Sequence, residues 1–287
     1  MTNPAYHLAQ PETRTTSVIF ASPHSGRDYS DAFLAKAVLD AAEIRSSEDA
    51  FVDLLYADAP ACGAPLLTAL APRAFLDLNR GPEEMDPALI AGVRRVSQNP
   101  RVASGLGIIP RVVANGRHIY RGKLTLEEAH NRITQYWRPY HDTLQTLIDE
   151  SHHRFGEAIL IDCHSMPHEA MESIDTNPAT RPQIVLGDRF GAAASGLIVD
   201  RVEAAFAAAG FRVARNMPFA GAYIAQKYGR PSRGQHALQI EIDRGLYMNE
   251  ATVTPHADFD VLRAALAGVI AEIAAIGRKP NVALAAE

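Results

Sequence analysis

Short apolar runs recur along the chain, each rich in Val, Ile or Leu and bounded by residues that favour turns. Runs of this length and composition predict buried strands. The predicted strands cover residues 16–22, 64–70, 157–165, 182–188 and 236–243.

Between these runs, apolar residues recur at helical spacing, which indicates faces that pack on a core. The predicted helices cover 47–59, a long segment from Thr125, 191–209 and 256–276. The segment from Thr125 opens with "TLEE", a capping-box pattern, and its Pro139 predicts a kink or a break.

Nearly continuous apolar strands that alternate with helices predict an α/β fold. We expect a three-layer sandwich in which helices flank a mixed, mostly parallel sheet. The 287 residues contain no internal repeat and no low-complexity linker, so the sequence predicts one domain over residues 1–287.

Composition narrows the setting of the protein. The chain is 47% hydrophobic and 21% charged with a formal charge of −5, which favours neither a nucleic-acid nor a membrane partner. The N-terminus lacks a signal-peptide pattern, and the late apolar segment around Glu272 is too short to span a bilayer. With only Cys62 and Cys163, a disulfide framework is not expected, so we predict a cytoplasmic protein.

Residues 94–126 form a basic stretch that is rich in Gly, Pro and Arg and contains no Asp or Glu. It is either a solvated loop excursion or a cationic wall near a site for an acidic substrate. Its cations are Arg94, Arg95, Arg101, Arg111, Arg117, Arg121 and Lys123.

Several common catalytic signatures are absent. The sequence contains no G-x-G-x-x-G, G-x-S-x-G or H-E-x-x-H motif, and "GRPSRGQH" lacks the Lys and Ser/Thr of a phosphate-binding loop. Redox chemistry with a dinucleotide and serine-based covalent catalysis are therefore disfavoured.

Polar residues cluster at the ends of predicted strands. His24 follows the first strand in "SPHSG", Asp162 and His164 share a face in "IDCHSMPH", and the last strand carries Gln239, Glu241 and Asp243 on one face. Ligands of open α/β sheets bind beyond the carboxyl ends of strands, where these side chains are expected. A single histidine there is usually structural, but several together favour a site.

Two histidines and one carboxylate are a ligand set that binds zinc and leaves a position open for water. His24 and His164 are the candidate histidines, and "SSEDAFVD" (46–53) offers the carboxylate. Asp49 is the candidate there, with Glu48 and Asp53 as alternatives. The same donors suit iron or manganese.

Taken together, these motifs resemble the N-formylglutamate amidohydrolases, a branch of the zinc-carboxypeptidase-like hydrolases. The resemblance extends from Ser17 to Tyr247. It rests on the ordered occurrence of "SPHSGRDY", "EDAFVDLLY", "FLDLNR", "GLGIIPRVV", "YWRPYHDTL", "DCHSMP", "NMPFAGAYI" and "HALQIEIDRGLYM". It implies a zinc-dependent hydrolase that cleaves N-formyl-L-glutamate to formate and glutamate, the last step of one histidine-degradation route.

The resemblance also implies residue roles. One Zn²⁺ per chain would be held by His24, Asp49 (preferred to Glu48) and His164, with Glu241 as general acid and base. "DLNR" places Arg80, helped by Asn79, on a substrate carboxylate, unless Arg80 only forms a salt bridge to Asp77. The remaining proposed residues are Arg111, Arg117 or Arg121 for a second carboxylate and His236 for the reaction intermediate.

Three features stay open at this point. His236 is equally well explained as structural, and Asp162 either orients a ligand histidine or caps its strand. Ala222 stands where the family pattern suggests a second glycine, which bears on fine specificity.

Other functions remain in competition. The same machinery suits an aspartoacylase-like deacylase or a small carboxypeptidase, and a non-catalytic protein that binds an acidic metabolite is a further alternative. A binding protein has no need of a general base, so Glu241 disfavours the last of these. The sequence leaves a homo-oligomer open.

Overall fold

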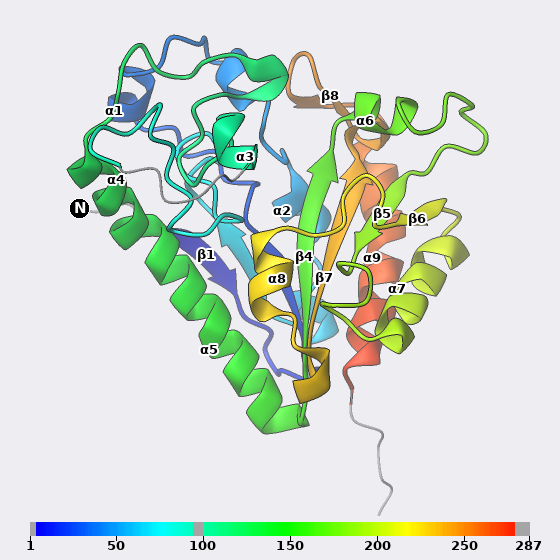
Figure 1. Ribbon diagram of the computed structural model, residues 1–287. Coiled ribbons are helices and arrows are strands. Elements are labelled where there is room, and N and C mark those ends of the chain that lie inside the picture. The colour runs from blue at the N-terminus through cyan, green and yellow to red at the C-terminus, as the bar shows by residue number, and fades with distance from the viewer. Residues whose placement is uncertain (1–3, 94–99, 279–287) are drawn as a thin grey trace, which may run out of the picture.

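A mixed sheet forms the centre of the protein in the computed structural model, which describes residues 4–93 and 100–278 (Figure 1). The sheet has seven strands in the order β1-β3-β2-β4-β7-β5-β6 in this part of the chain. Its strands are β1 (Tyr6–Ala9), β2 (Val18–Ser22), β3 (Leu66–Ala69), β4 (Ala158–Met166), β5 (Ile184–Gly187), β6 (Val213–Arg215) and β7 (Gln235–Asp243). A separate small ribbon pairs β8 (Met248–Asn249) with β9 (Thr254–Pro255).

Strand direction decides where the ends of the strands meet. β3, β2, β4 and β7 run parallel to one another, β1 and β5 join them antiparallel, and β6 is parallel to β5. This confirms the expected mixed, mostly parallel sheet. The carboxyl ends of β2, β4 and β7 therefore lie at one edge.

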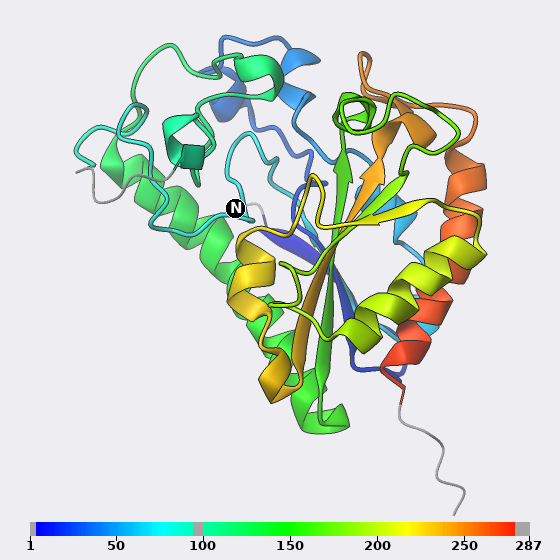
Figure 2. The ribbon, with the colours of Figure 1, turned by 45° about the vertical axis from the view of Figure 1, so that its right-hand side comes forward.

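Helices cover both faces of the sheet, as Figure 2 shows with α5 and α8 on one side and α7 and α9 on the other. The first layer contains α5 (Arg138–Phe155) and α8 (Tyr223–Tyr228), and the second contains α2 (Val52–Leu55), α7 (Gly196–Ala208) and α9 (Phe259–Ile276). The three-layer α/β sandwich is thus confirmed.

Alternation along β4 supplies both halves of the core. Ile159, Ile161 and Cys163 pack in the cluster that contains the apolar residues of α7 and α9. Ala158 and Leu160 face the other way and pack with α5. Because both faces are covered, the strand reads as a continuous apolar run, and each fully buried Ile or Leu contributes about 1.5–3 kcal/mol.

All five predicted strands are confirmed, with ends that differ by at most two residues from those expected. The sequence did not predict β1 and β6, which lie at the two edges of the sheet. Their short segments "YHLA" and "VAR" are only partly buried, so they carry no strong apolar pattern.

The helix predicted over 47–59 is wrong for most of its length. Only Val52–Leu55 is α-helical, and a short 3₁₀ turn follows at Pro60–Cys62. Phe51, which precedes the helix, has a left-handed φ of 67°, and the Asp49 N–H donates to the His24 carbonyl at 3.1 Å. This tertiary contact keeps the acidic residues in a loop, despite their helical spacing.

The long helical segment begins and breaks as predicted. Thr125 caps α4 (Leu126–Arg132) by accepting from the Glu128 N–H at 3.1 Å. A π-helical turn, Ile133–Trp137, then leads into α5, which has Pro139 in its first turn. Proline lacks an N–H and disturbs the preceding turn, which accounts for the break. The other predicted helices are confirmed as α7 and α9, each beginning a few residues late.

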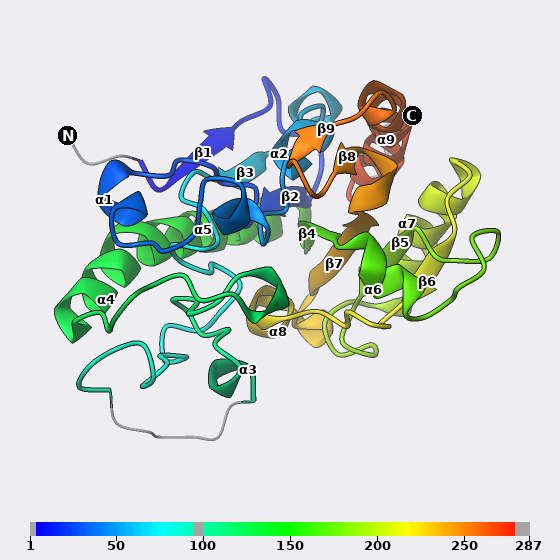
Figure 3. The ribbon, with the colours of Figure 1, turned by 90° about the horizontal axis from the view of Figure 1, so that it is seen from above.

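A long irregular connection leads from β3 to α4. Figure 3 shows it, with α3 (Pro100–Ala103), spread out from the sheet on the side of α8. It contains most of the basic stretch, although Arg94 and Arg95 lie outside the described residues. The remaining short helices and 3₁₀ turns are α1 (Asp31–Leu34), α6 (His168–Glu172), Glu43–Arg45, Ala114–Gly116, Pro231–Arg233 and Arg244–Leu246. Among the described helices, none has the length and apolarity needed to cross a membrane.

Packing of α5 on the sheet generates a first prediction. Leu144 is fully buried in the cluster that contains Ile19 and Leu160. Leu144→Ala should lower the free energy of unfolding by about 2–5 kcal/mol, because it leaves a cavity. Thr146→Ala, at an exposed position of the same helix, should change it by no more than about 0.5 kcal/mol. Urea unfolding followed by circular dichroism measures both, and equal effects would contradict this packing.

Candidate active site

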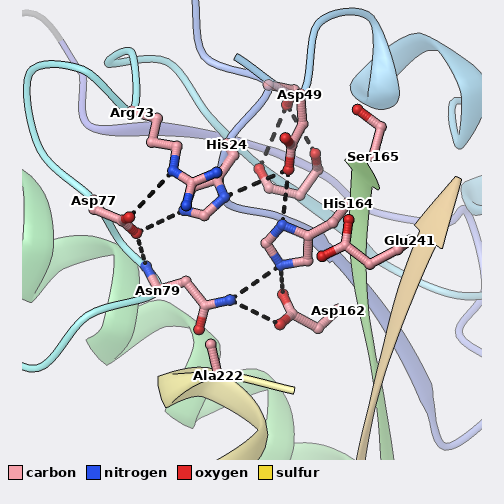
Figure 4. A network of polar contacts seen from close by, with 12 residues as sticks. His24, Asp49, Arg73, Asp77, Asn79, Asp162, His164, Ser165, Ala222 and Glu241 are labelled. Atoms are coloured by element: carbon pink, nitrogen blue, oxygen red, sulfur yellow. Dashed lines mark hydrogen bonds and ion pairs between the residues drawn. The ribbon is translucent and has the colours of Figure 1, made fainter. Parts of the chain in front are cut away.

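Four side chains from different segments meet at the carboxyl edge of the sheet (Figure 4). His24 lies just beyond β2, His164 lies in β4, and Glu241 is the register partner of His164 on β7. Asp49 comes from the loop before α2. Local alternation turns the even-numbered residues of β4 toward the face that α5 covers only in its lower part, so the strand ends there in polar residues.

The turn "SPHSG" presents His24 because the chain passes very close to a neighbouring segment there. A Cβ at Gly26 would overlap the backbone oxygen of Ala71, so only glycine fits. The Asp28 N–H also donates to the Leu70 carbonyl at 2.9 Å. These contacts hold the turn against the end of β3 and leave His24 facing the site.

Three ligand atoms converge in a buried cluster. The Asp49 Oδ2 lies 2.8 Å from the His164 Nδ1 and 3.4 Å from the His24 Nδ1. The potential ligand atoms of these residues lie within 4.8 Å of one another, and each residue is at most 2% exposed. The His24 Nδ1 is buried and has no hydrogen-bond partner among the described residues. A bound cation would satisfy this atom, so the residues fit a metal ion.

Carboxylates hold the far nitrogen of each ring. The His24 Nε2 lies 2.7 Å from the Asp77 Oδ1, and the His164 Nε2 lies 3.1 Å from the Asp162 Oδ1. A proton on the His24 Nε2 satisfies Asp77 and leaves the His24 Nδ1 lone pair directed at the centre of the cluster. This is how histidine ligands of metals are commonly oriented.

The charges in the cluster stabilise one another. Burial opposes ionisation of Asp49, but the adjoining imidazoles of His164 and His24 outweigh it and hold its pKa well below the usual range. Burial opposes ionisation of Asp77 as well, and His24 and Arg73 likewise lower its pKa. A buried carboxylate that stays ionised is a strong attraction for a divalent cation.

Of the three acidic candidates in 46–53, the structure brings only Asp49 to the histidines. Glu48 is held by the fork of Arg45, with Nε to Oε1 and Nη2 to Oε2 both at 3.0 Å. Asp53 pairs with Arg27 in the same two-pronged manner, both contacts being 2.9 Å. Spacing did not separate the three, because Glu48 pairs with Arg45 nearby whereas the partners of Asp49 and Asp53 come from distant segments.

Arg244 holds the second oxygen of Asp49 and was not predicted as a site residue. Its Nη2 donates to the Asp49 Oδ1 at 2.9 Å and its Nε donates to the Ser165 Oγ at 3.1 Å. The side chain is only 5% exposed. It directly follows "QIEID", and its place at the end of β7 is the signal that could have identified it.

Glu241 lies beside His164 in Figure 4 and is held from its own strand. The Gln239 Nε2 donates to the Glu241 Oε1 at 2.8 Å, while the Gln239 Oε1 accepts from the Ala222 N–H at 3.1 Å. Burial raises the pKa of Glu241 to about 7, with His164 opposing and Asp49 adding to the rise. A carboxylate in this state can both take up and release a proton near neutral pH.

Ala222 serves the site through its backbone, so its methyl group is not an obstacle. Its φ of −108° is accessible to any L-residue. The preceding Gly221 has a φ of 100° and is the position that needs glycine. The departure from the expected glycine at 222 is therefore compatible with the loop geometry.

Asn79 and Arg80 lie at the site in different roles. The Asn79 Nδ2 lies 3.2 Å from the His164 Nε2, and its Oδ1 accepts from the Ile224 N–H at 2.7 Å, so its amide is already engaged. The Arg80 Nε lies 3.9 Å from the Asp77 Oδ2 and, within the part of the chain that the structure describes, is a buried atom with no hydrogen-bond partner. The long contact to Asp77 leaves the guanidinium available to a ligand.

A cavity of about 500 Å³ opens over the cluster. Its walls come from the strand ends, the irregular connection at 104–116 and the loop 218–222. Four of the described arginines line it, namely Arg73, Arg80, Arg101 and Arg244. This distribution of charge suits an anionic ligand.

The structure does not bring the predicted second substrate cations to the cavity. Arg111 donates to Asp86 at 2.8 Å and Arg117 donates to Glu43 at 2.8 Å. Arg121 is exposed, and none of the three is among the described residues that line the cavity. Arg111 and Arg117 of the basic stretch pair with acidic residues of other segments. Among the described cations of the stretch, only Arg101 lines the cavity.

His236 is also not at the site, which corrects its assignment to the reaction intermediate. It lies at the start of β7, five residues before Glu241, which corresponds to about 17 Å along the strand. Its Nδ1 accepts from the Ser195 N–H at 3.3 Å. The ring is therefore a structural hydrogen-bonding group at the opposite edge of the sheet.

A three-layer α/β sheet that gathers two histidines, a carboxylate cluster and arginines at its carboxyl edge is the framework of a hydrolase for small anionic substrates. The family model of the N-formylglutamate amidohydrolases matches residues 16–248. The chain therefore belongs to the N-formylglutamate amidohydrolase family.

Individual relatives agree with this assignment. The N-formylglutamate deformylase of Pseudomonas putida is 30% identical over 236 residues, which cover 81% of this chain and 82% of the relative. That of Pseudomonas aeruginosa is 29% identical over 267 residues, covering 91% and 94%. The crystal structure of N-formylglutamate amidohydrolase from Ralstonia eutropha JMP134 superimposes with a TM-score of 0.88 at 35% identity, covering 95% and 98%.

The separation of Asp49 from Glu48 generates a matched pair of variants. If Asp49 is a ligand, Asp49→Asn should weaken zinc binding by more than the roughly 10–100-fold that loss of an outer partner costs, because it removes the negative charge of the carboxylate. Glu48→Gln should leave zinc affinity within about threefold of the wild type. Competition with a chromophoric chelator measures both affinities, and the reverse order would show that Glu48 is the ligand.

Proposed function

We propose that the protein hydrolyses the amide bond of N-formyl-L-glutamate to formate and L-glutamate with the help of one Zn²⁺ held by His24, Asp49 and His164. Family membership and the activity named for its relatives support the substrate. The observation that carries the metal is the convergence of two Nδ1 atoms and a carboxylate oxygen in a buried cluster. In this role the protein completes a route of histidine degradation, which we place in the cytoplasm.

The donor set supports zinc, although iron and manganese accept the same donors. When bound, such an ion polarises the scissile carbonyl and lowers the pKa of a water molecule. The surrounding side chains support such an ion, since Asp77 hydrogen-bonds to the His24 ring, Asp162 lies 3.1 Å from the His164 ring, and Arg244 donates to the outer oxygen of Asp49.

Glu241 is the proposed general base and acid. It takes a proton from the attacking water and delivers it to the amine nitrogen as the C–N bond breaks, which returns the carboxylate to its starting state. Gln239 supports this role because it fixes one carboxylate oxygen and leaves the other free. General acid–base catalysis of this kind contributes about 10²–10⁴-fold.

Arginines of the cavity are proposed to bind the two carboxylates of the substrate. Arg80 suits one of them, since its guanidinium fork matches two carboxylate oxygens. Arg101, on the wall formed by the basic stretch, is the proposed partner of the other. Arg73 pairs with Asp77 at 3.2 Å and Arg244 pairs with Asp49 at 2.9 Å, so these two arginines support the histidine cluster.

The size of the cavity supports a second candidate. A volume of about 500 Å³ accommodates acyl groups larger than formyl, so an aspartoacylase-like deacylase remains in competition. A non-catalytic binding protein is disfavoured by the buried Glu241 beside the cluster.

Substrate comparison separates the two enzymatic candidates. With zinc-loaded protein, kcat/KM should be highest for N-formyl-L-glutamate and at least about tenfold lower for the N-acetyl and N-succinyl compounds. Release of formate, acetate or succinate is measured with coupled assays. Faster hydrolysis of the acetyl compound would replace the formyl assignment, and absence of all three activities would remove the hydrolase proposal.

Replacement of Glu241 tests the proton transfer. Glu241→Gln should retain zinc but lower kcat by about 10²–10⁴-fold, because the amide has no basic oxygen to accept the proton. Metal content and steady-state rates are measured on the same preparation. His164→Ala is the companion variant and should lose both zinc and turnover, whereas undiminished kcat in Glu241→Gln would assign the proton transfer to another group.

A further inference from the structure

The segment Asp77–Arg80 carries three residues of the site in irregular backbone. Asp77 orients His24, Asn79 contacts His164, and Arg80 lines the cavity. No strand or helix holds these four residues. Their geometry therefore depends on contacts with other segments.

Side chains from the long helical segment hold two carbonyls of this backbone. The Trp137 Nε1 donates to the Arg80 carbonyl at 2.9 Å. The His141 Nε2 lies 2.9 Å from the Leu78 carbonyl. Both carbonyls flank Asn79, so the two contacts bracket the residue that touches the histidine cluster.

The hydrogen bonds of His141 determine its tautomer. A carbonyl only accepts, so the Nε2 carries the proton, and the Nδ1 accepts from the Tyr228 hydroxyl at 2.8 Å. Burial lowers the pKa of His141 to about 3, and the charge of Lys227 adds to the effect. The ring is therefore a neutral, fixed donor.

Helical spacing places the two donors on the same face of the helix. Trp137 is the last residue of the π-helical turn and His141 lies four residues later, and their ring centroids are 4.0 Å apart. Residues four apart in a helix lie close together, and π turns such as the one that ends at Trp137 often occur at functional sites. This gives a role to "YWRPYHDTL", a motif that the proposed chemistry leaves without one.

The aromatic pair is also braced from α8. The Lys227 Nζ lies 4.7 Å from the centre of the Trp137 ring, and the Tyr228 ring stacks on His141 at 5.9 Å. The N–H of Ile224 in the same helix donates to Asn79. We call the hydrogen bonds from Trp137 to the Arg80 carbonyl and from His141 to the Leu78 carbonyl the bracket. Together with the Ile224 contact, the bracket connects the long helical segment and α8 to residues 77–80.

We propose that Trp137 and His141 are positioning residues that set the affinity for the substrate carboxylate by fixing the backbone beneath Arg80. The proposal rests on the proposed function in so far as Arg80 binds substrate. A purely structural role would change stability without a selective change in KM.

Trp137→Phe tests the bracket because it removes the N–H and keeps an aromatic ring. KM for N-formyl-L-glutamate and the Kd of L-glutamate should rise by about 3–10-fold, as expected for loss of one hydrogen bond. kcat should stay within about twofold and zinc content should not change. Tyr136→Phe is the matched control, since Tyr136 lies in the same turn and packs on Phe75, away from the cavity; its KM should be that of the wild type.

The chain contains a single tryptophan, so its fluorescence reports on this position alone. Saturation with L-glutamate should shift or quench the emission of Trp137 in the wild type. Arg80→Lys should raise the Kd of L-glutamate measured from this response at least tenfold, because the guanidinium fork that binds the carboxylate is lost. An unchanged response in Arg80→Lys would disconnect the indole from the ligand site.

His141→Gln and His141→Leu provide a second test if Trp137→Phe folds poorly. Gln retains an N–H donor for the Leu78 carbonyl and should keep KM nearer the wild-type value than Leu does. Equal KM values in the two variants, or a Trp137→Phe effect no larger than that of Tyr136→Phe, would overturn the proposal. If the wild type shows no hydrolysis but L-glutamate still changes the emission, the proposed function fails. The bracket is then tested by the Kd of L-glutamate in the wild type and in the His141 variants.

Discussion

The carboxylate of Asp49 is the group through which the segments of the site are joined. One oxygen faces the inner nitrogens of His24 and His164, and the other accepts from Arg244. A buried carboxylate is costly unless it is paired, and each of its partners follows or belongs to a different strand of the sheet. The loop that carries Asp49 is not helical, and Phe51 at its end has a left-handed φ. The strand ends, the loop and the end of β7 are thereby fixed relative to one another.

The sheet supports this arrangement because its two faces differ. Toward α7 and α9, the central residues of β4 and β7 are apolar, as Ile161, Cys163 and Ile240 show. Toward α5 and α8, Ala158 and Leu160 are apolar, but Asp162 and His164 follow on the same face. The lower part of that face is core and the upper part is the site. The packed core therefore limits movement of the site on the same strands. Closely spaced charged groups require such a rigid support.

The irregular segments supply what regular strands cannot. The hydrogen-bonded strands fix the positions of His164 and Glu241. Many of the residues that contact them and line the cavity come from loops, and separate hydrogen bonds hold each of these loops in place. Asn79 is held by backbone and side-chain contacts on both sides, and the loop at 222 is fixed by Gln239. The cavity has apolar as well as cationic walls, which suits a small ligand with charged ends.

Features that depend on local periodicity could be predicted from the amino-acid sequence. Alternation located the inner strands and put Asp162 with His164 and Gln239 with Glu241, because neighbours two residues apart share a face. Pairings across long separations were decided only by the tertiary structure. His164 meets Asp49 over 115 positions, and Arg117 meets Glu43 over 74, so the third ligand and the engaged arginines were not separable by spacing. His236 shows a related limit of prediction from the sequence. It lies in the same strand as Glu241, but periodicity does not say which end of a strand reaches the site.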